Sequence, residues 1–142
     1  MTRVDFYILA AGSGQEAAER TACRIAEKAF RQGHQVYLHV ADGDAAERLD
    51  ELLWTFRAGS FVPHARWPLP EGGEAPPVLI GADEPPAGPD VLVNLAPEVP
   101  GFFSRFLRVA EIVGGDEASR ARARERYRWY RERGYPLHTH EL

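Results

Sequence analysis

The sequence predicts a three-layer α/β/α fold with a mostly parallel, Rossmann-like central sheet, formed by residues 1–142 as a single domain. The chain has 142 residues, of which 44% are hydrophobic, so it can bury roughly two-thirds of its unfolded surface around one core. Short apolar runs alternate with amphipathic helical stretches, and helical connections of this length favour parallel strands joined by right-handed crossovers. We find no internal repeat and no domain boundary.

The N-terminal half contains two strand-helix units. The apolar run from Val4 to Ala10 is typical of a buried strand. Gly12-Ser13-Gly14 then predicts a turn, with Ser13 as the helix N-cap. The expected elements that follow are a helix over residues 15–32 that stops at Gly33, a strand over residues 35–40, and a helix over residues 44–54.

The middle of the chain is predicted to consist mainly of loops. Residues 56–89 contain eight of the eleven prolines, which favour turns and cannot donate to a strand ladder. Two short strands are expected within it, at residues 61–64 and 78–80, and a buried strand follows at residues 91–95.

Two helices are predicted in the C-terminal part. In residues 101–113, six apolar side chains recur at helical spacing; they are Phe102, Phe103, Phe106, Val109, Ile112 and Val113. Gly114-Gly115 breaks this pattern. Asp116 or Ser119 can cap a second, arginine-rich helix that should end at Gly134.

The arginine-rich helix is strongly basic in an acidic chain. Seven arginines against two glutamates give residues 120–133 a formal charge of +5, which leaves −9 for the rest of a chain whose total is −4. At helical spacing one face carries Arg120, Arg124, Tyr127, Arg128 and Arg131, and the other side carries Arg122, Arg126, Trp129, Tyr130 and Arg133. The like charges within such a row repel one another unless an anionic group lies against them. The pattern therefore indicates either an acidic partner or a solvated helix paired with the chain's own carboxylates.

The stretch from Gly12 to Ala17 matches the G-x-G-x-x-A pattern of dinucleotide-binding turns. A nucleotide-binding enzyme built on Gly12 and Gly14 is therefore one alternative. However, Glu16 and Glu19 place negative charge where a pyrophosphate would approach, and we favour a plain strand-to-helix turn. We predict no cofactor.

The remaining reactive side chains form no recognisable set. Cys23, the only cysteine, lies in an amphipathic helical pattern and is interpreted as a small core residue. His138 and His140 lack a third ligand at metal spacing, so we interpret them as part of a solvated tail. We expect no catalytic residues and no metal. The chain shows neither a signal peptide nor an apolar segment long enough to span a membrane, which favours a cytoplasmic protein.

Large apolar side chains are concentrated around the start of the loop region, at Trp54, Phe56, Phe61, Val62 and Trp67. Some must enter the core, but a protein-binding patch has the same composition. Both interpretations remain open at this point.

Several segments taken together resemble the chi-subunit family of bacterial DNA polymerase III holoenzyme. They are Asp5-Phe6-Tyr7, LDELLWTF at residues 49–56, SFVPH at residues 60–64, Pro77 to Ile80, Val93 to Leu95, RERYRWYR at residues 124–131, and Gly134-Tyr135. The similarity extends along the whole chain, and the order and spacing of the segments carry it more than any single motif.

This resemblance implies a non-catalytic adaptor with an α/β/α fold that joins the clamp loader to single-stranded DNA-binding protein. It implies binding of that protein's acidic C-terminal tail beside the last long helix, at Val113, Arg120, Arg124, Tyr127, Arg128, Gly134 and Tyr135. Arginine stands at 120 and 128, where the family often has lysine. DNA would then be contacted only indirectly.

The resemblance also implies a second interface, for the psi subunit or another clamp-loader subunit, at Trp54, Phe61 and Val62. The alternative to an adaptor, besides the nucleotide-binding enzyme, is a protein that binds single-stranded nucleic acid directly through the arginine-rich helix. The net charge of −4 argues against that alternative, because the rest of the surface would repel phosphates.

Overall fold

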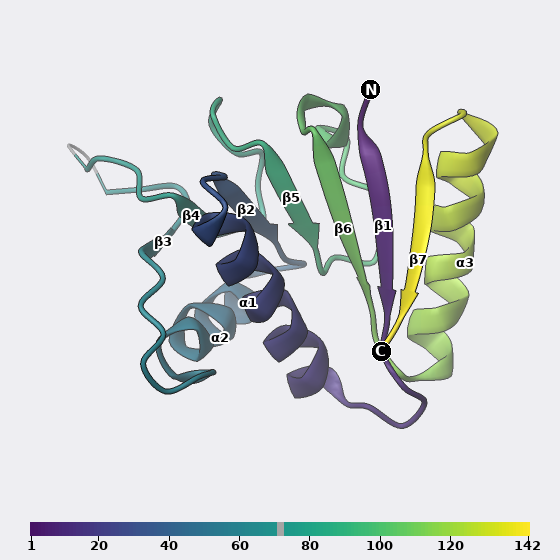
Figure 1. The fold of residues 1–142 in the computed structure, drawn as a ribbon, viewed down its shortest axis with the longest axis horizontal. Helices are drawn as coiled ribbons and strands as arrows, with labels where there is room; N and C mark the ends of the chain where they lie inside the picture. The colour runs from purple at the N-terminus through teal and green to yellow at the C-terminus, as the bar shows by residue number, and fades with distance from the viewer. Residues whose placement is uncertain (71–72) are drawn as a thin grey trace.

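The computed structural model describes residues 1–70 and 73–142. Along the chain (Figure 1) the strands and helices are β1 (Arg3–Ile8), α1 (Gln15–Arg31), β2 (Val36–His39), α2 (Gly43–Thr55), β3 (His64–Arg66), β4 (Val78–Gly81), β5 (Val91–Asn94), a short 3₁₀ helix (Phe103–Arg105), β6 (Arg108–Val113), α3 (Glu117–Glu132) and β7 (Leu137–Glu141).

The strands form one sheet in the order β3-β4-β2-β5-β6-β1-β7, and every pairing between described strands is parallel. Helices α1 and α2 pack on one face, here called the α1–α2 face, and α3 packs on the other, the α3 face (Figure 1). The predicted three-layer α/β/α class is confirmed. Strand β7, next to β1, forms one edge of the sheet, and α3 packs near this edge. Strand β3 forms the opposite edge, and α2 packs near it.

Each face of the sheet has its own apolar core. On the α1–α2 face, Leu38, Val93 and Ile112 pack against Leu49 and Ala26 of the helices. Across the sheet, Phe6, Val109 and Val113 pack against Tyr130 of α3 and Phe103 of the 3₁₀ helix. Neighbouring residues of β2, β5 and β6 alternate between the two cores, as expected for parallel strands buried on both faces.

The prediction of a helix over residues 101–113 is wrong. Phe103–Arg105 forms only a 3₁₀ turn, and Arg108–Val113 is strand β6. Its apolar residues point alternately to both cores, so a fully buried strand produced a near-continuous apolar run that also satisfied helical spacing. The interpretation of the C-terminal residues as a solvated tail is also wrong, since Leu137–Glu141 pairs with β1 as an edge strand.

The first helix begins differently from the prediction. Ser13 is not its N-cap; Gly14 takes that position without a side-chain hydrogen bond. Most of the other predicted elements are present with ends shifted by a few residues. They are strands β1 and β2, helices α1 and α2, and strands β4 and β5. The predicted ends of α1 and α3 at Gly33 and Gly134 are confirmed. These glycines have φ of 89° and 80°, values that L side chains rarely adopt.

Candidate functional site

Helix α3 is fixed to the sheet by a buried polar cluster centred on Glu111 of β6. The Glu111 carboxylate is fully buried and accepts hydrogen bonds from Arg126 Nε at 3.0 Å, Tyr130 Oη at 2.7 Å and Asn94 Nδ2 at 3.0 Å. Burial raises the pKa of Glu111, and Arg126 and the hydrogen bonds only partly offset this. Sequence reasoning placed Arg126 opposite Arg124 but missed its structural role. A glutamate within the apolar run of residues 109–113 is the signal that could have revealed it.

The start of α3 carries the predicted cap. The Asp116 side chain accepts a hydrogen bond from the Ser119 backbone N–H at 3.0 Å. The pKa of Asp116 is lowered mainly by the Ser119 side chain and also by this backbone bond. A negative charge here also complements the positive end of the helix dipole. The helix is therefore anchored at its first turn and along its buried side, which leaves the face of Arg124 toward solvent.

A groove of about 330 Å³ runs between α3 and the adjoining edge of the sheet. Its walls come from β1, β6, β7 and α3, and its lining residues are Phe6, Ile8, Val113, Arg120, Ala123, Arg124, Tyr127, Thr139 and Glu141. We call this the α3 groove. Four residues predicted from the sequence thus come together in one place: Val113, Arg120, Arg124 and Tyr127.

The floor of the α3 groove is apolar, and its α3 wall is cationic. Tyr127 packs edge-to-face on Phe6, with ring centroids 5.4 Å apart, which fixes the ring beside Val113. Arg120 donates from Nη2 to the Leu9 carbonyl at 3.0 Å, while its buried Nε has no partner in the part of the chain that is described. This arrangement leaves one guanidinium N–H beside the groove unsatisfied.

Arg124 stands at the rim of the groove. Its Nη2 lies 2.9 Å from Glu117 Oε1, but the two side chains are 62% and 82% exposed. An ion pair so exposed contributes little free energy, so an anionic ligand can compete for Arg124. Glu141, on the opposite wall, is the one carboxylate among the described lining residues, and it disfavours anions on the β7 side.

Three predicted residues do not line the α3 groove. Arg128 is exposed one turn beyond Arg124, and Gly134 ends α3. Tyr135 packs against Phe103 and Tyr130 with centroid distances of 5.1 and 6.2 Å. Tyr135, which the resemblance grouped with Val113, therefore lies outside the α3 groove, in an aromatic cluster at the C-terminal end of the helix.

The glycine turn after β1 has its own backbone partners. The Gly12 N–H donates to the Gly115 carbonyl at 3.4 Å, and the Ser13 N–H donates to the Ala10 carbonyl at 3.1 Å. Gly115 lies so close that a Cβ there would be 2.3 Å from the Ala10 oxygen. Because these two amides already donate to backbone carbonyls, they are not arranged to cradle a phosphate, which favours the plain-turn interpretation.

The second predicted interface divides into exposed and buried parts. Trp54 is 62% and Phe61 80% exposed, whereas Val62 and Phe56 are buried. Val62 is therefore part of the apolar core and not of the exposed surface. The loop before Phe61 is tied to α1 by Glu27, which accepts hydrogen bonds from Arg57 Nη2 at 2.7 Å and from Ser60 Oγ. The Arg57 bond is the main reason that the pKa of Glu27 is lowered.

The described residues contain no group of three or more His, Cys, Asp or Glu side chains suited to hold a metal ion. His140 instead contacts Asp5, with Nε2 and Oδ1 2.8 Å apart. Cys23 is buried, as predicted, and burial raises the pKa of its thiol to about 12. No helix in the described ranges combines the length and apolar character needed to cross a membrane.

Comparison with known proteins gives one consistent family. A family model described as DNA polymerase III chi subunit, HolC, matches residues 1–138. Three curated relatives carry the name DNA polymerase III subunit chi. The protein from Pseudomonas aeruginosa is 49% identical over all of this chain and 98% of its own length, that from Escherichia coli 33% identical over 98% and 97%, and that from Haemophilus influenzae 31% identical over 96% and 95%.

Proposed function

The chain belongs to the DNA polymerase III chi subunit family, a family of accessory, non-catalytic subunits, and we propose that it is an adaptor whose α3 groove binds the acidic C-terminal tail of single-stranded DNA-binding protein. In this proposal the adaptor links that protein to the clamp loader during DNA replication. The α3 groove is the observation that carries the proposal.

The chemistry of the groove suits the end of an acidic peptide. A chain terminus offers a carboxylate next to one side chain, and the groove offers guanidinium groups next to an apolar floor formed by Val113, Tyr127 and Phe6. Recognition of a terminal carboxylate beside a shaped apolar pocket is a common mode of peptide binding. We assign the last side chain of the tail to that floor.

Arg124 is assigned to the terminal carboxylate. The planar guanidinium can make two parallel hydrogen bonds to a carboxylate, and such charge-assisted bonds are stronger than neutral ones. The competing bond to Glu117 is solvent-exposed and is readily exchanged. Arg120, which lines the same wall, supplies a second positive charge.

Arg128 and Arg131 lie outside the groove on the exposed side of α3. Exposed charges of this kind act mainly on the rate of encounter, because they attract an oppositely charged partner over several ångströms without desolvation. We therefore assign them to the acidic residues that precede the terminus, where they raise the association rate more than the final affinity.

The direct test measures the fluorescence anisotropy of a labelled acidic tail peptide as the protein is added. Arg124→Ala is expected to weaken binding by roughly 10- to 100-fold, since a hydrogen bond to a charged group contributes about 1.5–3 kcal/mol. Arg133→Ala is the matched control, because Arg133 lies over the Trp129 ring on the same helix and outside the groove. Equal affinities for wild type and Arg124→Ala at low salt would remove Arg124 from this role.

We further propose that Trp54 and Phe61 form the contact with the psi subunit or another clamp-loader subunit. Two large apolar side chains this exposed on adjacent segments are the kind of anchor that protein interfaces bury. Trp54→Ala with Phe61→Ala should abolish co-purification with the clamp loader, while Leu107→Ala, which removes a similarly exposed side chain elsewhere, should not. Intact co-purification of the double variant would assign the patch to something else.

A further inference from the structure

One part of the α1–α2 face has no helix on it. Helix α1 contacts β2, β5 and β6, and α2 contacts β3 and β4, so in Figure 1 the same face of β1 and β7 stays uncovered. All-parallel sheets almost always have both faces covered. The uncovered strands therefore form an unusual surface for this class of fold.

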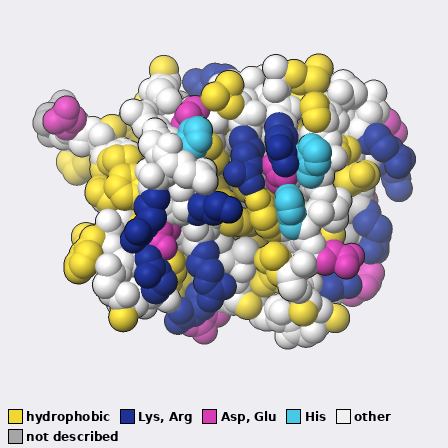
Figure 2. Space-filling view, viewed as in Figure 1, with side chains coloured by type: hydrophobic (Ala, Val, Ile, Leu, Met, Phe, Trp, Pro, Cys, Tyr) yellow, Lys and Arg dark blue, Asp and Glu magenta, His cyan; other side chains and the backbone are white. Residues whose placement is uncertain are grey.

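A groove of about 560 Å³ lies where α1 borders this uncovered surface. We call it the α1 groove. Its floor is aliphatic, with Leu9, Ala17, Ile25 and Ala29, and Tyr7 and Arg108 of the sheet line the side opposite the helix. Figure 2 shows Lys, Arg and His side chains gathered around apolar side chains on this face.

The helix wall of the α1 groove carries a regular row of cations. Arg20, Arg24 and Lys28 all line it, and residues four apart on a helix are separated by about 6 Å along its axis. Arg20 is partly engaged by Glu16, but the side chains of Arg24 and Lys28 have no hydrogen-bond or ion-pair partner in the described chain. No side-chain carboxylate lines the groove in the described residues.

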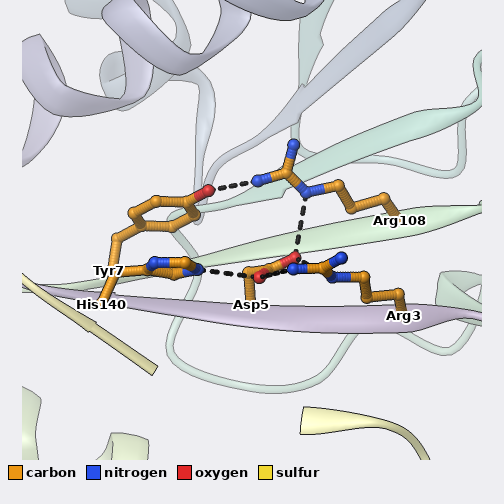
Figure 3. Close-up of polar contacts among 5 residues, drawn as sticks. All are labelled: Arg3, Asp5, Tyr7, Arg108 and His140. Atoms are coloured by element: carbon orange, nitrogen blue, oxygen red, sulfur yellow. Dashed lines mark hydrogen bonds and ion pairs between the residues drawn. The ribbon is translucent and has the colours of Figure 1, made fainter. Parts of the chain in front are cut away.

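The sheet wall continues this positive surface (Figure 3). Asp5 is buried and binds Arg3, Arg108 and His140, with distances of 3.2, 3.0 and 2.8 Å. One carboxylate thus faces two guanidinium groups, so the cluster keeps a surplus positive charge. Its hydrogen bonds hold Arg108 at the edge of the groove.

An aromatic pair is fixed in the same cluster. The rings of Tyr7 and His140 stack with centroids 4.6 Å apart and planes at 14°, and Arg108 Nη2 donates to the Tyr7 hydroxyl. Tyr7 therefore presents a rigid ring that lines the α1 groove together with the cations of the helix. Figure 3 shows this ring stacked on His140 and bonded to Arg108.

We propose that the α1 groove binds single-stranded nucleic acid, with phosphates along Arg24, Lys28 and Arg108 and a base against Tyr7. A row of cations suits a ligand whose charges repeat along its chain, and a fixed ring suits unpaired bases, the two features that single-strand-binding grooves combine. The site is separate from the α3 groove and does not depend on the function proposed for it.

The net charge of −4 makes this contact weak and sensitive to salt, so it is tested at low ionic strength. The probe is a fluorescein-labelled oligothymidylate of about 15 nucleotides, titrated with the full chain from about 20 to 200 mM NaCl. The slope of log K against log salt should be about −2, because each neutralised phosphate on a single strand contributes about −0.7. A duplex of the same length should bind more weakly, since its bases are not free to stack.

The decisive variant is Arg24→Ala with Lys28→Ala, two exposed positions whose loss leaves the core intact. It should weaken oligonucleotide binding at least 10-fold at about 20 mM NaCl and reduce the salt slope by about 1.4. Arg122→Ala with Arg131→Ala removes the same charge from α3 and should have little effect. Tyr7→Leu should weaken binding by 5-fold or more, as expected for the loss of one stacked base.

Three results would overturn the proposal. The first is no binding by wild type at about 20 mM NaCl. The second is a larger loss in the α3 control pair than in the α1 pair, which would place nucleic acid on the arginine-rich helix. The third is an unchanged oligonucleotide affinity in the α1 pair together with lost binding of an acidic peptide, which would assign the α1 groove to a protein partner.

Discussion

Glu111 shows how a single residue positions the whole α3 surface. Its carboxylate is the common acceptor for Arg126 and Tyr130 of the helix, and all three side chains are buried. Removing the acceptor therefore leaves the Arg126 charge without its counter-ion and the Tyr130 hydroxyl without an acceptor in a low-dielectric site, which costs far more than the bonds themselves stabilise.

We predict that Glu111→Leu lowers the free energy of unfolding by about 3–5 kcal/mol. Glu111→Gln should cost less, because its carbonyl oxygen still accepts one of these bonds. Urea unfolding followed by circular dichroism measures both, with the exposed Glu117→Gln as a control that should stay within about 0.5 kcal/mol. A Glu111→Leu protein as stable as wild type would show that the cluster does not anchor α3.

Asp5 makes stability depend on pH in a predictable direction. Burial by itself raises the pKa of Asp5, but hydrogen bonds from His140 and Arg3 and the charge of Arg108 outweigh it and hold the pKa below its ordinary value of 3.8. A carboxyl group with a lowered folded-state pKa stabilises the fold above its unfolded-state pKa, and this contribution disappears as the pH falls through the folded-state pKa.

The expected consequence is a pH-dependent difference between wild type and Asp5→Asn. Wild type should be more stable by about 2 kcal/mol near pH 7, and the difference should shrink as the pH falls below about 4. Chemical unfolding at pH 7, 5, 4 and 3 measures it. A difference that grows on acidification would contradict the assigned direction.

Substitution of Glu141 should change the affinity of the α3 groove for the peptide in the opposite direction from substitution of Arg124. Its carboxylate shares the groove with Arg120 and Arg124 and should repel an anionic ligand. Glu141→Gln is therefore predicted to tighten binding of the acidic tail peptide by about 2- to 10-fold, as expected from removing a like charge that is partly screened by water. Weaker binding would mean that Glu141 contacts the peptide favourably.

At the scale of elements, the loops after β1 and β6 lock together through Gly115. Any Cβ at this position would meet backbone atoms, with the Ala10 oxygen at 2.3 Å and the Ser13 nitrogen at 2.7 Å. Gly115→Ala should therefore destabilise the protein by about 2–3 kcal/mol. Gly101→Ala is the control, because nothing lies within 4 Å of a Cβ there. Similar thermal unfolding of the two variants would contradict this account.

The elements that the sequence predicted correctly are those with a local signal. Helices α1 and α3 have an amphipathic pattern and clear ends. Gly33 and Gly134 end these helices because they adopt a positive φ that side chains with a Cβ disfavour. Strand β6 had no such signal, because burial on both faces removes the alternation that distinguishes a strand. Strand β7 was missed because its side chains are mostly polar, and its pairing with β1 is a long-range contact.

The same distinction explains the candidate site. Helical spacing alone grouped Arg120, Arg124 and Tyr127, and the structure places them together. Spacing could not show that Phe6, Ile8 and Glu141 complete the groove, because these residues come from distant strands. Nor could it separate Arg126, which is buried on Glu111, from arginines that face solvent.

At the scale of the whole molecule, the α3 groove and the Trp54–Phe61 patch are associated with opposite edges of the sheet. Six strand spacings separate β3 from β7 in the sheet order, a distance of about 29 Å. An adaptor can therefore hold two partners without contact between them. Substitutions this far apart with no shared neighbours normally act independently.

We accordingly predict that Trp54→Ala with Phe61→Ala changes the affinity for the acidic tail peptide by less than about 2-fold. Calorimetric titration of the peptide into this variant and into wild type checks the prediction. A large loss of affinity, with circular dichroism unchanged, would mean that the two surfaces communicate through the sheet.

The central claim, that an acidic peptide terminus binds between α3 and the β7 edge, is tested most directly by nuclear magnetic resonance of the isotope-labelled full chain. On addition of the tail peptide, the largest backbone amide shifts should fall on Val113, Arg120, Arg124 and Tyr127 and on neighbouring residues of β1 and β7. They should vanish when the peptide lacks its last residue. Shifts concentrated along α1, or equal shifts with the truncated peptide, would contradict the account.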